Sequence, residues 1–131
     1  MDNPKNQKSI SKYIKLEDYK VFDYEIPDIF LDIVINKNEV NVTTKLKLVK
    51  RNKNTKNLIL DGTDILIKNI FIDGSLLEEK YYKQQKNNLK IYNINKDNFL
   101  LKIEGIIKPN QNTSLLGMYE SNGIITTQCE A

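Results

Sequence analysis

The chain has 131 residues, of which 40% are hydrophobic and 28% are charged, a composition typical of one globular domain with its own core. Its 20 basic and 17 acidic side chains leave a formal charge of +3, which by itself does not indicate a polyanionic partner. The sequence contains no histidine, which excludes a Ser-His-Asp or Cys-His nucleophile pair and an HExxH zinc motif within it.

The start of the chain is polar and lacks periodicity, so we expect residues 1–12 to form a flexible arm and residues 13–131 to form a single β domain. No apolar run resembles a signal peptide or reaches the roughly 18 residues of a membrane-spanning helix. Cys129 is the only cysteine, so no disulfide can form within the chain, and we expect a reducing, cytoplasmic location. Because no base is available to activate its thiol, Cys129 is predicted to be a small buried side chain.

Residues 29–35 and 40–48 alternate apolar and polar side chains, which is the period of a β-strand. The first segment is predicted to have one buried face, formed by Ile29, Leu31, Ile33 and Ile35. The polar stretch between the two segments is typical of a turn, so they are predicted to form a hairpin.

The apolar runs at 58–62 and 64–74 both end in Asp-Gly, a strong turn signal. Residues 75–86 leave two alternatives open, because Ser75 and Glu78 have the spacing of a helix capping box whereas the short, Tyr-rich sequence slightly favours a strand. Residues 99–107 alternate again, and Pro109 ends that strand. Short strands without a crossover helix predict an all-β, mostly antiparallel sandwich.

Three groups of side chains could bind a ligand, and each has a simpler interpretation. The basic run at 45–56 has one arginine and no aromatic residue, so we interpret it as a solvated strand face and loop and predict no nucleic-acid partner. The acidic cluster at 17–32 lacks the glycine-centred loop of an EF-hand and is interpreted as a surface that complements the basic hairpin. Tyr13, Tyr19 and Tyr24 are interpreted as rings packed at the rim of a sheet rather than as a ligand platform.

Three segments together resemble the N-terminal domain of the bacterial aminopeptidase N family, the M1 zinc metallopeptidases. The segments are YIKLEDYKVFDYEIPDIFLDI, LILDGTDILIKNIFIDG and NTSLLGMYESNGIITTQCEA, with anchors at 60–62, 112–114 and, most specifically, 127–131. The resemblance implies a saddle-shaped, mostly antiparallel β domain, followed in the family by a catalytic domain that carries HExxH and binds zinc. We therefore expect the chain to be truncated before that domain, to hold no cofactor itself and to be inactive alone.

The same resemblance assigns the candidate site to Gln128 and Glu130. It implies that Gln128 lines the S1 pocket for the first side chain of a peptide, and that Glu130 helps to bind the free α-amino group. A carboxylate suits this role because its charge-assisted hydrogen bonds favour an ammonium group over a neutral internal peptide. Leu116 and Met118 depart from the acidic residue and the leucine that are usual in the family.

We therefore expect the N-terminal structural and substrate-binding domain of a zinc-dependent aminopeptidase that removes N-terminal amino acids from peptides. Its expected partners are a peptide N-terminus and the missing catalytic domain, with no nucleic acid and no membrane. The face that would meet the catalytic domain is expected to permit self-association. The alternative is a free-standing β-sandwich module that mediates protein interactions without catalysis.

Overall fold

A computed structural model describes residues 15–129, and within them the chain forms antiparallel β-strands and short 3-10 helices without an α-helix. The strands are β1 (Tyr24–Ile35), β2 (Val40–Lys50), β3 (Leu58–Asp61), β4 (Leu66–Ile72), β5 (Ser75–Leu76), β6 (Tyr82–Gln84), β7 (Asn88–Ile91), β8 (Asn98–Ile107), β9 (Gly117–Ser121) and β10 (Ile124–Gln128). The 3-10 helices are η1 (Leu16–Asp18), η2 (Glu79–Tyr81) and η3 (Pro109–Gln111). The all-β prediction is confirmed, and the helical alternative for 75–86 is wrong because this segment forms β5, η2 and β6. The predicted arm and Tyr13 lie outside the described residues.

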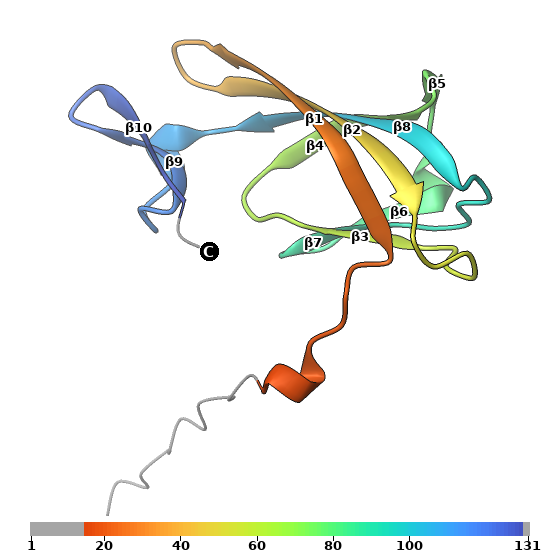
Figure 1. Cartoon of the computed structure of the whole chain (residues 1–131). Helices are drawn as coiled ribbons and strands as arrows, with labels where there is room; N and C mark the ends of the chain where they lie inside the picture. Colours follow the sequence, from red (N-terminus) through yellow and green to blue (C-terminus); the bar gives the residue numbers. More distant parts are fainter. Residues whose placement is uncertain (1–14, 130–131) are drawn as a thin grey trace, which may run out of the picture.

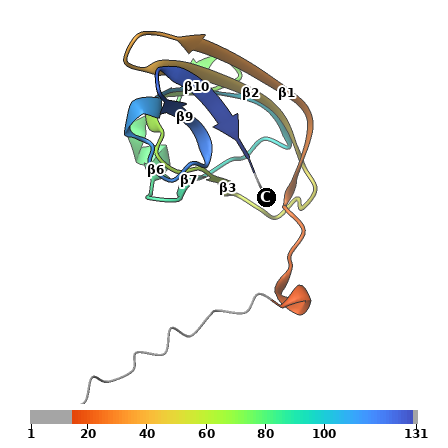
Figure 2. The same ribbon diagram turned by 90° about the vertical axis from the view of Figure 1, so that its left-hand side faces the viewer.

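The strands form two stacked layers and a separate hairpin (Figure 1). The large sheet has the order β1-β2-β8-β4-β5, and the small sheet beneath it has the order β3-β7-β6. The hairpin of β9 and β10 follows β8 and η3, and in two perpendicular views it lies below the end of the large sheet that carries the β1–β2 turn (Figures 1 and 2). This arrangement confirms the predicted β1–β2 hairpin and the antiparallel sandwich.

The core lies between the two layers and is formed by alternate residues of the facing strands. The large sheet contributes Leu48, Ile70 and Leu101, and the small sheet contributes Leu58 and Ile91, all fully buried. The predicted alternation in β8 is confirmed in its first half, where Phe99 and Leu101 are buried while Lys102 and Glu104 lie on the opposite face. Burial of these apolar side chains is the main force that holds the two sheets together.

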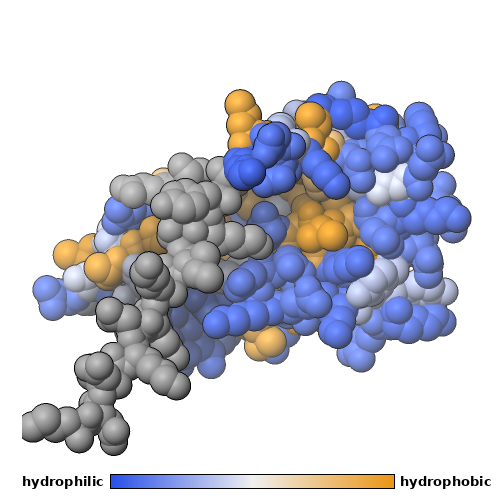
Figure 3. Space-filling model, turned by 90° about the horizontal axis from the view of Figure 1, so that it is seen from below, coloured by the Kyte–Doolittle hydropathy of each residue, from blue (hydrophilic) through white to orange (hydrophobic). Residues whose placement is uncertain are grey.

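The predicted buried face of β1 is wrong for the half of the strand that leads to the turn. Ile29, Leu31, Ile33 and Ile35 are 45–62% exposed, although they share the core-facing side with the buried Leu46. The reason is that the strands of the small sheet have only three or four residues and cannot cover the 12 residues of β1. From below, the molecule shows a hydrophobic area bordered by hydrophilic residues (Figure 3). We call the uncovered, core-side face of β1 residues 29–35 the apolar underside.

The predicted pairing of the acidic cluster with the basic hairpin is confirmed at two positions. Lys47 lies 4.0 Å from Asp28, and Arg51 lies 3.4 Å from Glu25, between side-chain nitrogen and oxygen atoms. Lys50 contradicts the prediction of a solvated run, because it is only 6% exposed and its ammonium donates a 2.8 Å hydrogen bond to the carbonyl oxygen of Ile94. Its position two residues after Leu48 places it on the core face, where its carbon chain packs and its charged end reaches a polar atom.

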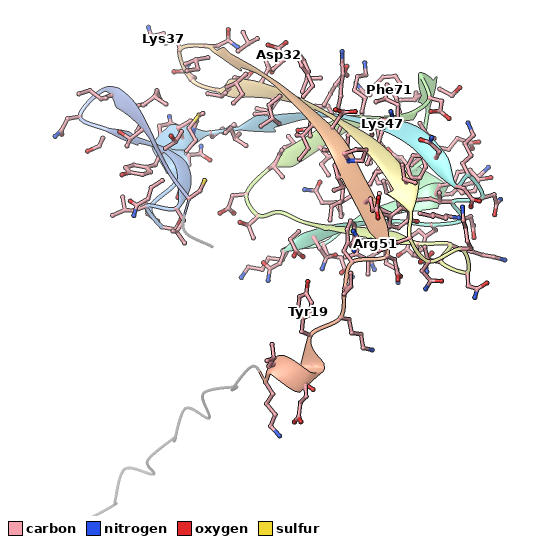
Figure 4. The ribbon with its side chains drawn as sticks, viewed as in Figure 1. Tyr19, Asp32, Lys37, Lys47, Arg51 and Phe71 are labelled. Carbon is pink, nitrogen blue, oxygen red and sulfur yellow. The ribbon has the colours of Figure 1, made fainter. Side chains whose placement is uncertain are left out.

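The two described tyrosines of the predicted rim behave differently. Tyr24 is buried, makes an edge-on ring contact with Phe99 at 6.1 Å between centroids and donates a hydrogen bond to the carbonyl oxygen of Asn57. Burial raises the pKa of Tyr24 above its ordinary value. Tyr19 precedes the first strand and is exposed, so the rim interpretation is wrong for it (Figure 4).

The predicted Asp-Gly turn between β4 and β5 is confirmed, and its carboxylate is bound on two sides. Asp73 and Gly74 have φ values of 49° and 82°, the left-handed conformations that a tight hairpin turn requires. The Asp73 carboxylate accepts a 2.8 Å hydrogen bond from the Leu100 N–H and a second one from the Lys96 ammonium. The backbone hydrogen bond first and the lysine second lower the pKa of Asp73.

We expect Asp73→Asn to lower the free energy of unfolding at pH 7 but not at strongly acidic pH. The lowered pKa means that the folded state favours the carboxylate, so the stabilisation is complete above the ordinary Asp pKa and is lost as the pH falls through the lowered value. The loss should stay below about 1 kcal/mol, because solvent screens an exposed ion pair. Urea unfolding at pH 7 and at strongly acidic pH measures it, with Asp61→Asn as the control at the other Asp-Gly pair. An equal loss at both pH values would contradict the assignment to charge.

Candidate functional site

The C-terminal hairpin fixes the position of the candidate residue Gln128. Asn122 and Gly123 connect β9 to β10 with φ values of 51° and 78°, as in a two-residue hairpin turn with both central residues left-handed. The register then places Gln128 opposite Gly117, at the end of the hairpin away from the turn. Because side chains alternate along a strand, exposed Gln128 shares a face with half-buried Thr126 and Tyr119.

A single side chain, that of Asn112, organises the loop that leads into this hairpin. Its amide nitrogen donates to the carbonyl oxygens of Leu116 and Met118, at 2.7 and 2.9 Å. Its amide oxygen accepts hydrogen bonds from the backbone N–H of Ser114 at 3.0 Å and from the Ser114 hydroxyl at 2.8 Å. These bonds hold the loop where Leu115 takes a left-handed φ of 59°, which a leucine rarely adopts. Asn112 therefore fixes the start of β9 and, through the β9–β10 register, the position of Gln128.

The sequence interpretation used 112–114 only as an anchor of the family resemblance and did not assign Asn112 this role. The available signal was an Asn two residues before a Ser, the spacing at which an Asn side chain accepts a backbone hydrogen bond in a turn. The bonds to Leu116 and Met118 had no sequence signal, because they depend on how the loop closes.

We expect Asn112→Ala to loosen the hairpin by about 1 to 3 kcal/mol, because two carbonyl oxygens lose their donor and the loop loses its organising side chain. Amide hydrogen exchange in residues 117–128 measures the effect, which should exceed any change in the large sheet. Asn110→Ala is the matched control, since Asn110 is an exposed residue of the same type in η3. Equal exchange rates in the two variants would contradict the role of Asn112.

The two predicted site residues have different outcomes. Gln128 is exposed at the end of β10, whereas Glu130 lies outside the described residues, so their proximity stays a prediction. The prediction that Cys129 is buried is wrong, because its thiol is free and exposed. Cys129 follows the last residue of β10, next to exposed Gln128 and beyond the strand pairing that ends there.

A second group of polar side chains lies on the outer face of the large sheet, and its one carboxylate is held by two neighbouring side chains. Asn41, Thr43, Asn69 and Glu104 line a hollow of about 310 Å³. One carboxylate oxygen of Glu104 accepts a 2.8 Å hydrogen bond from Lys102, and the other accepts a 2.9 Å hydrogen bond from Asn69. The Lys102 bond first and the Asn69 bond second lower the pKa of Glu104. This arrangement stabilises a carboxylate in place and is suited to joining β4 to β8.

Neither a metal-binding group nor a helix that could span a membrane is found between residues 15 and 129. No three His, Cys, Asp or Glu side chains there are grouped so that they could hold a metal ion. The described helices are also too short and insufficiently apolar to cross a membrane.

Comparisons with known proteins identify the relatives of this chain. No family model matches it. It is 32% identical over 121 residues to aminopeptidase N of Haemophilus influenzae, an alignment that covers 92% of this chain and 14% of that protein. The chain is homologous to the N-terminal region of aminopeptidase N. Aminopeptidase N of Escherichia coli is 33% identical over 114 residues, again with only 13% of its length covered.

Solved structures agree with this relationship. Aminopeptidase A of Legionella pneumophila, solved in complex with aspartic acid, superposes with a TM-score of 0.80 and 29% identity over 90% of this chain and 14% of that chain. An M1 zinc metallopeptidase variant of Deinococcus radiodurans, solved with a Tyr-Ser-Ala substrate, gives a TM-score of 0.63 over 82% of this chain and 27% of that chain. At 11% identity, the second likeness shows the fold alone. The predicted resemblance to aminopeptidase N and the predicted all-β class are confirmed.

Proposed function

We propose that this chain is the N-terminal structural and substrate-binding domain of a zinc-dependent aminopeptidase that removes N-terminal amino acids from peptides. The observation that carries the proposal is the homology to aminopeptidase N over 92% of the chain. In this role, Gln128 lines part of the S1 pocket and Glu130 binds the α-ammonium group of the substrate. Zinc and the hydrolytic groups are supplied by the remainder of the enzyme.

The construction of the hairpin supports the proposed role of Gln128. A residue that lines a substrate pocket must be held in place before the substrate arrives, since ordering it on binding would cost free energy. Asn112 fixes the loop, the loop fixes β9, and β9 fixes β10 along five paired positions that end at Gln128. The chain therefore presents Gln128 on a regular strand.

The apolar underside supports a docking role as well. Contiguous exposed apolar side chains on a sheet typically mark a surface that another protein covers. In the proposed function, the remainder of the aminopeptidase covers Ile29, Leu31, Ile33 and Ile35. The same surface favours the alternative function, a β-sandwich module that binds another protein without catalysis.

A chimera tests the proposal against this alternative. The segment of Haemophilus influenzae aminopeptidase N that aligns with this chain is replaced by the chain, and the product is compared with an enzyme from which the segment is deleted. We expect chelator-sensitive cleavage of an alanyl chromogenic substrate by the chimera and none by the deletion or the isolated chain. A folded chimera without activity would contradict the proposal and favour the interaction module.

A further inference from the structure

We propose that the free edge of β1 is a strand-addition site for an extended segment of another polypeptide, with basic residues on one face and apolar residues on the other. The inference goes beyond the proposed aminopeptidase role and uses neither Gln128 nor Glu130. It rests on the backbone pattern of β1, on the exposure of its side chains and on the charges of its outer face.

The backbone of β1 presents unpaired hydrogen-bonding groups along one side. β1 is the first strand of the large sheet and pairs only with β2 within the described residues. The Asn36 N–H donates to the Glu39 carbonyl oxygen at 2.9 Å, which makes these two residues a hydrogen-bonded pair at the turn. Such pairs alternate with non-bonded pairs in an antiparallel ladder, so the N–H and C=O groups of Ile35, Ile33 and Leu31 point away from β2. An incoming strand would find donors and acceptors at every second residue.

The features that usually prevent an edge strand from pairing with another chain are present at the start of β1 but not in its second half. Proline, charged residues and bulges commonly prevent pairing at sheet edges. In β1, Pro27 and a register shift between Glu25 and Asp28 lie near the beginning. From residue 29 to residue 35 the single charged side chain is that of Asp32, and this half extends to the turn at the outer margin of the sheet (Figure 1).

The two faces of the second half of β1 define the chemistry of a segment that could pair with its edge. On the core side, the apolar residues of an added strand would lie beside the apolar underside and extend it. The outer face carries Asp28, Phe30, Asp32 and Val34, with Phe30 and Val34 about half exposed. Residues directly opposite each other on paired strands interact on the same face, so the outer residues of an added strand would lie beside these carboxylates and this ring.

The contacts between β2 and β1 show which side chains bind favourably to this outer face. Lys47 pairs with Asp28 at 4.0 Å, and the Lys45 ammonium lies 5.1 Å from the centre of the Phe30 ring. Asp32 is opposite Thr43 and has no ion-pair partner among residues 15–129. A basic residue on the free side of β1 would therefore give Asp32 the partner that β2 does not supply.

A second copy of this chain fits the edge less well. Two copies of β1 would place the carboxylates of both strands on one outer face, and a pairing centred on residue 32 would put Asp32 directly opposite its own copy. Like charges directly opposite each other destabilise a strand pair. The site therefore favours a basic strand over self-association.

Synthetic peptides test the site directly. The probe is a labelled peptide with the sequence of β2, VNVTTKLKLVK, and its control replaces the two outer-face lysines, which correspond to Lys45 and Lys47, with glutamates. Fluorescence anisotropy should show the lysine peptide binding about tenfold more tightly than the glutamate peptide, since two outer-face charges reverse sign together beside the carboxylates of β1. Equal affinity for the two peptides, or no binding of either, would overturn the inference.

Two variants locate the binding to the edge of β1. Ile33→Pro removes an N–H that points away from β2, so it should abolish peptide binding while leaving the β1–β2 ladder intact. Asp32→Lys should reverse the preference and favour the glutamate peptide, and it tests the site even if the proline variant does not fold. Glu79→Lys makes the same charge change in η2 and should leave the preference unchanged. The unchanged chain could instead dimerise and bind neither peptide. If Ile33→Pro then abolished the dimer, a second copy would be shown to occupy the edge, and the proposal would be overturned.

Discussion

Glu130→Gln should lower kcat/KM on peptides with a free α-amine by about ten- to a hundredfold in the chimera with Haemophilus influenzae aminopeptidase N. The substitution keeps the size of the side chain but removes its charge. A hydrogen bond to a charged group is worth roughly 1.5 to 3 kcal/mol, and each 1.4 kcal/mol is a factor of about ten in kcat/KM. The chimera is required because the proposed ammonium site is completed by the remainder of the enzyme.

The effect should be selective for substrates that carry an ammonium group. N-acylated peptides have none, so their weak hydrolysis should be unchanged by Glu130→Gln. Glu120→Gln is the matched control, because Glu120 is an exposed residue of the same type on β9. If Glu130 were merely a solvated residue, the activation free energy obtained from kcat/KM would change by less than about 0.5 kcal/mol for both substrates. That result would remove the proposed amine-binding role.

Leu48→Ala should lower the free energy of unfolding by about 2 to 5 kcal/mol, the range for truncating a buried leucine. Leu48 is 0% exposed and lies in the core between the two sheets, so the variant loses buried apolar surface and leaves a cavity. Leu100→Ala is the control, since Leu100 lies on the outer face of β8 and is 45% exposed. Urea unfolding followed by circular dichroism measures both variants.

The control should lose less than about 1 kcal/mol, because much of the Leu100 side chain already contacts water. Similar losses in the two variants would mean that the two faces of the large sheet do not differ in burial. That result would contradict the placement of the core between the sheets.

Alternation in the sequence predicted where strands lie but not what covers them. In β8, the apolar positions Phe99 and Leu101 are buried as predicted, because the small sheet lies beneath them. The same alternation in β1 leaves Leu31 and Ile33 exposed, because the small sheet does not extend that far. The period of a strand identifies an apolar face, whereas burial depends on the lengths of strands that are distant in the sequence.

For single side chains, burial was predicted wrongly where the position on the sheet, and not the residue type, decides which face the side chain occupies. Lys50 is buried because it continues the alternation of Leu46 and Leu48, although it belongs to a basic run. For the candidate site, Gln128 and Glu130 were predicted from the family resemblance and not from their spacing. The role of Asn112 emerged only from the folded loop, since its acceptors are carbonyl groups that every residue carries.

Because Lys50 is buried, its reactivity can report how often the two layers of the protein separate. Among residues 15–129 it is the one buried charged side chain, and its amine is held against the Ile94 carbonyl. An amine-acylating reagent can reach the exposed lysines of the native protein, but it reaches Lys50 only when the layers separate. The acylation rate of Lys50, read by mass spectrometry, therefore reports the frequency of that separation, as a protected amide does in hydrogen exchange. The chain has no tryptophan whose fluorescence could report on the core, and this lysine can serve in its place.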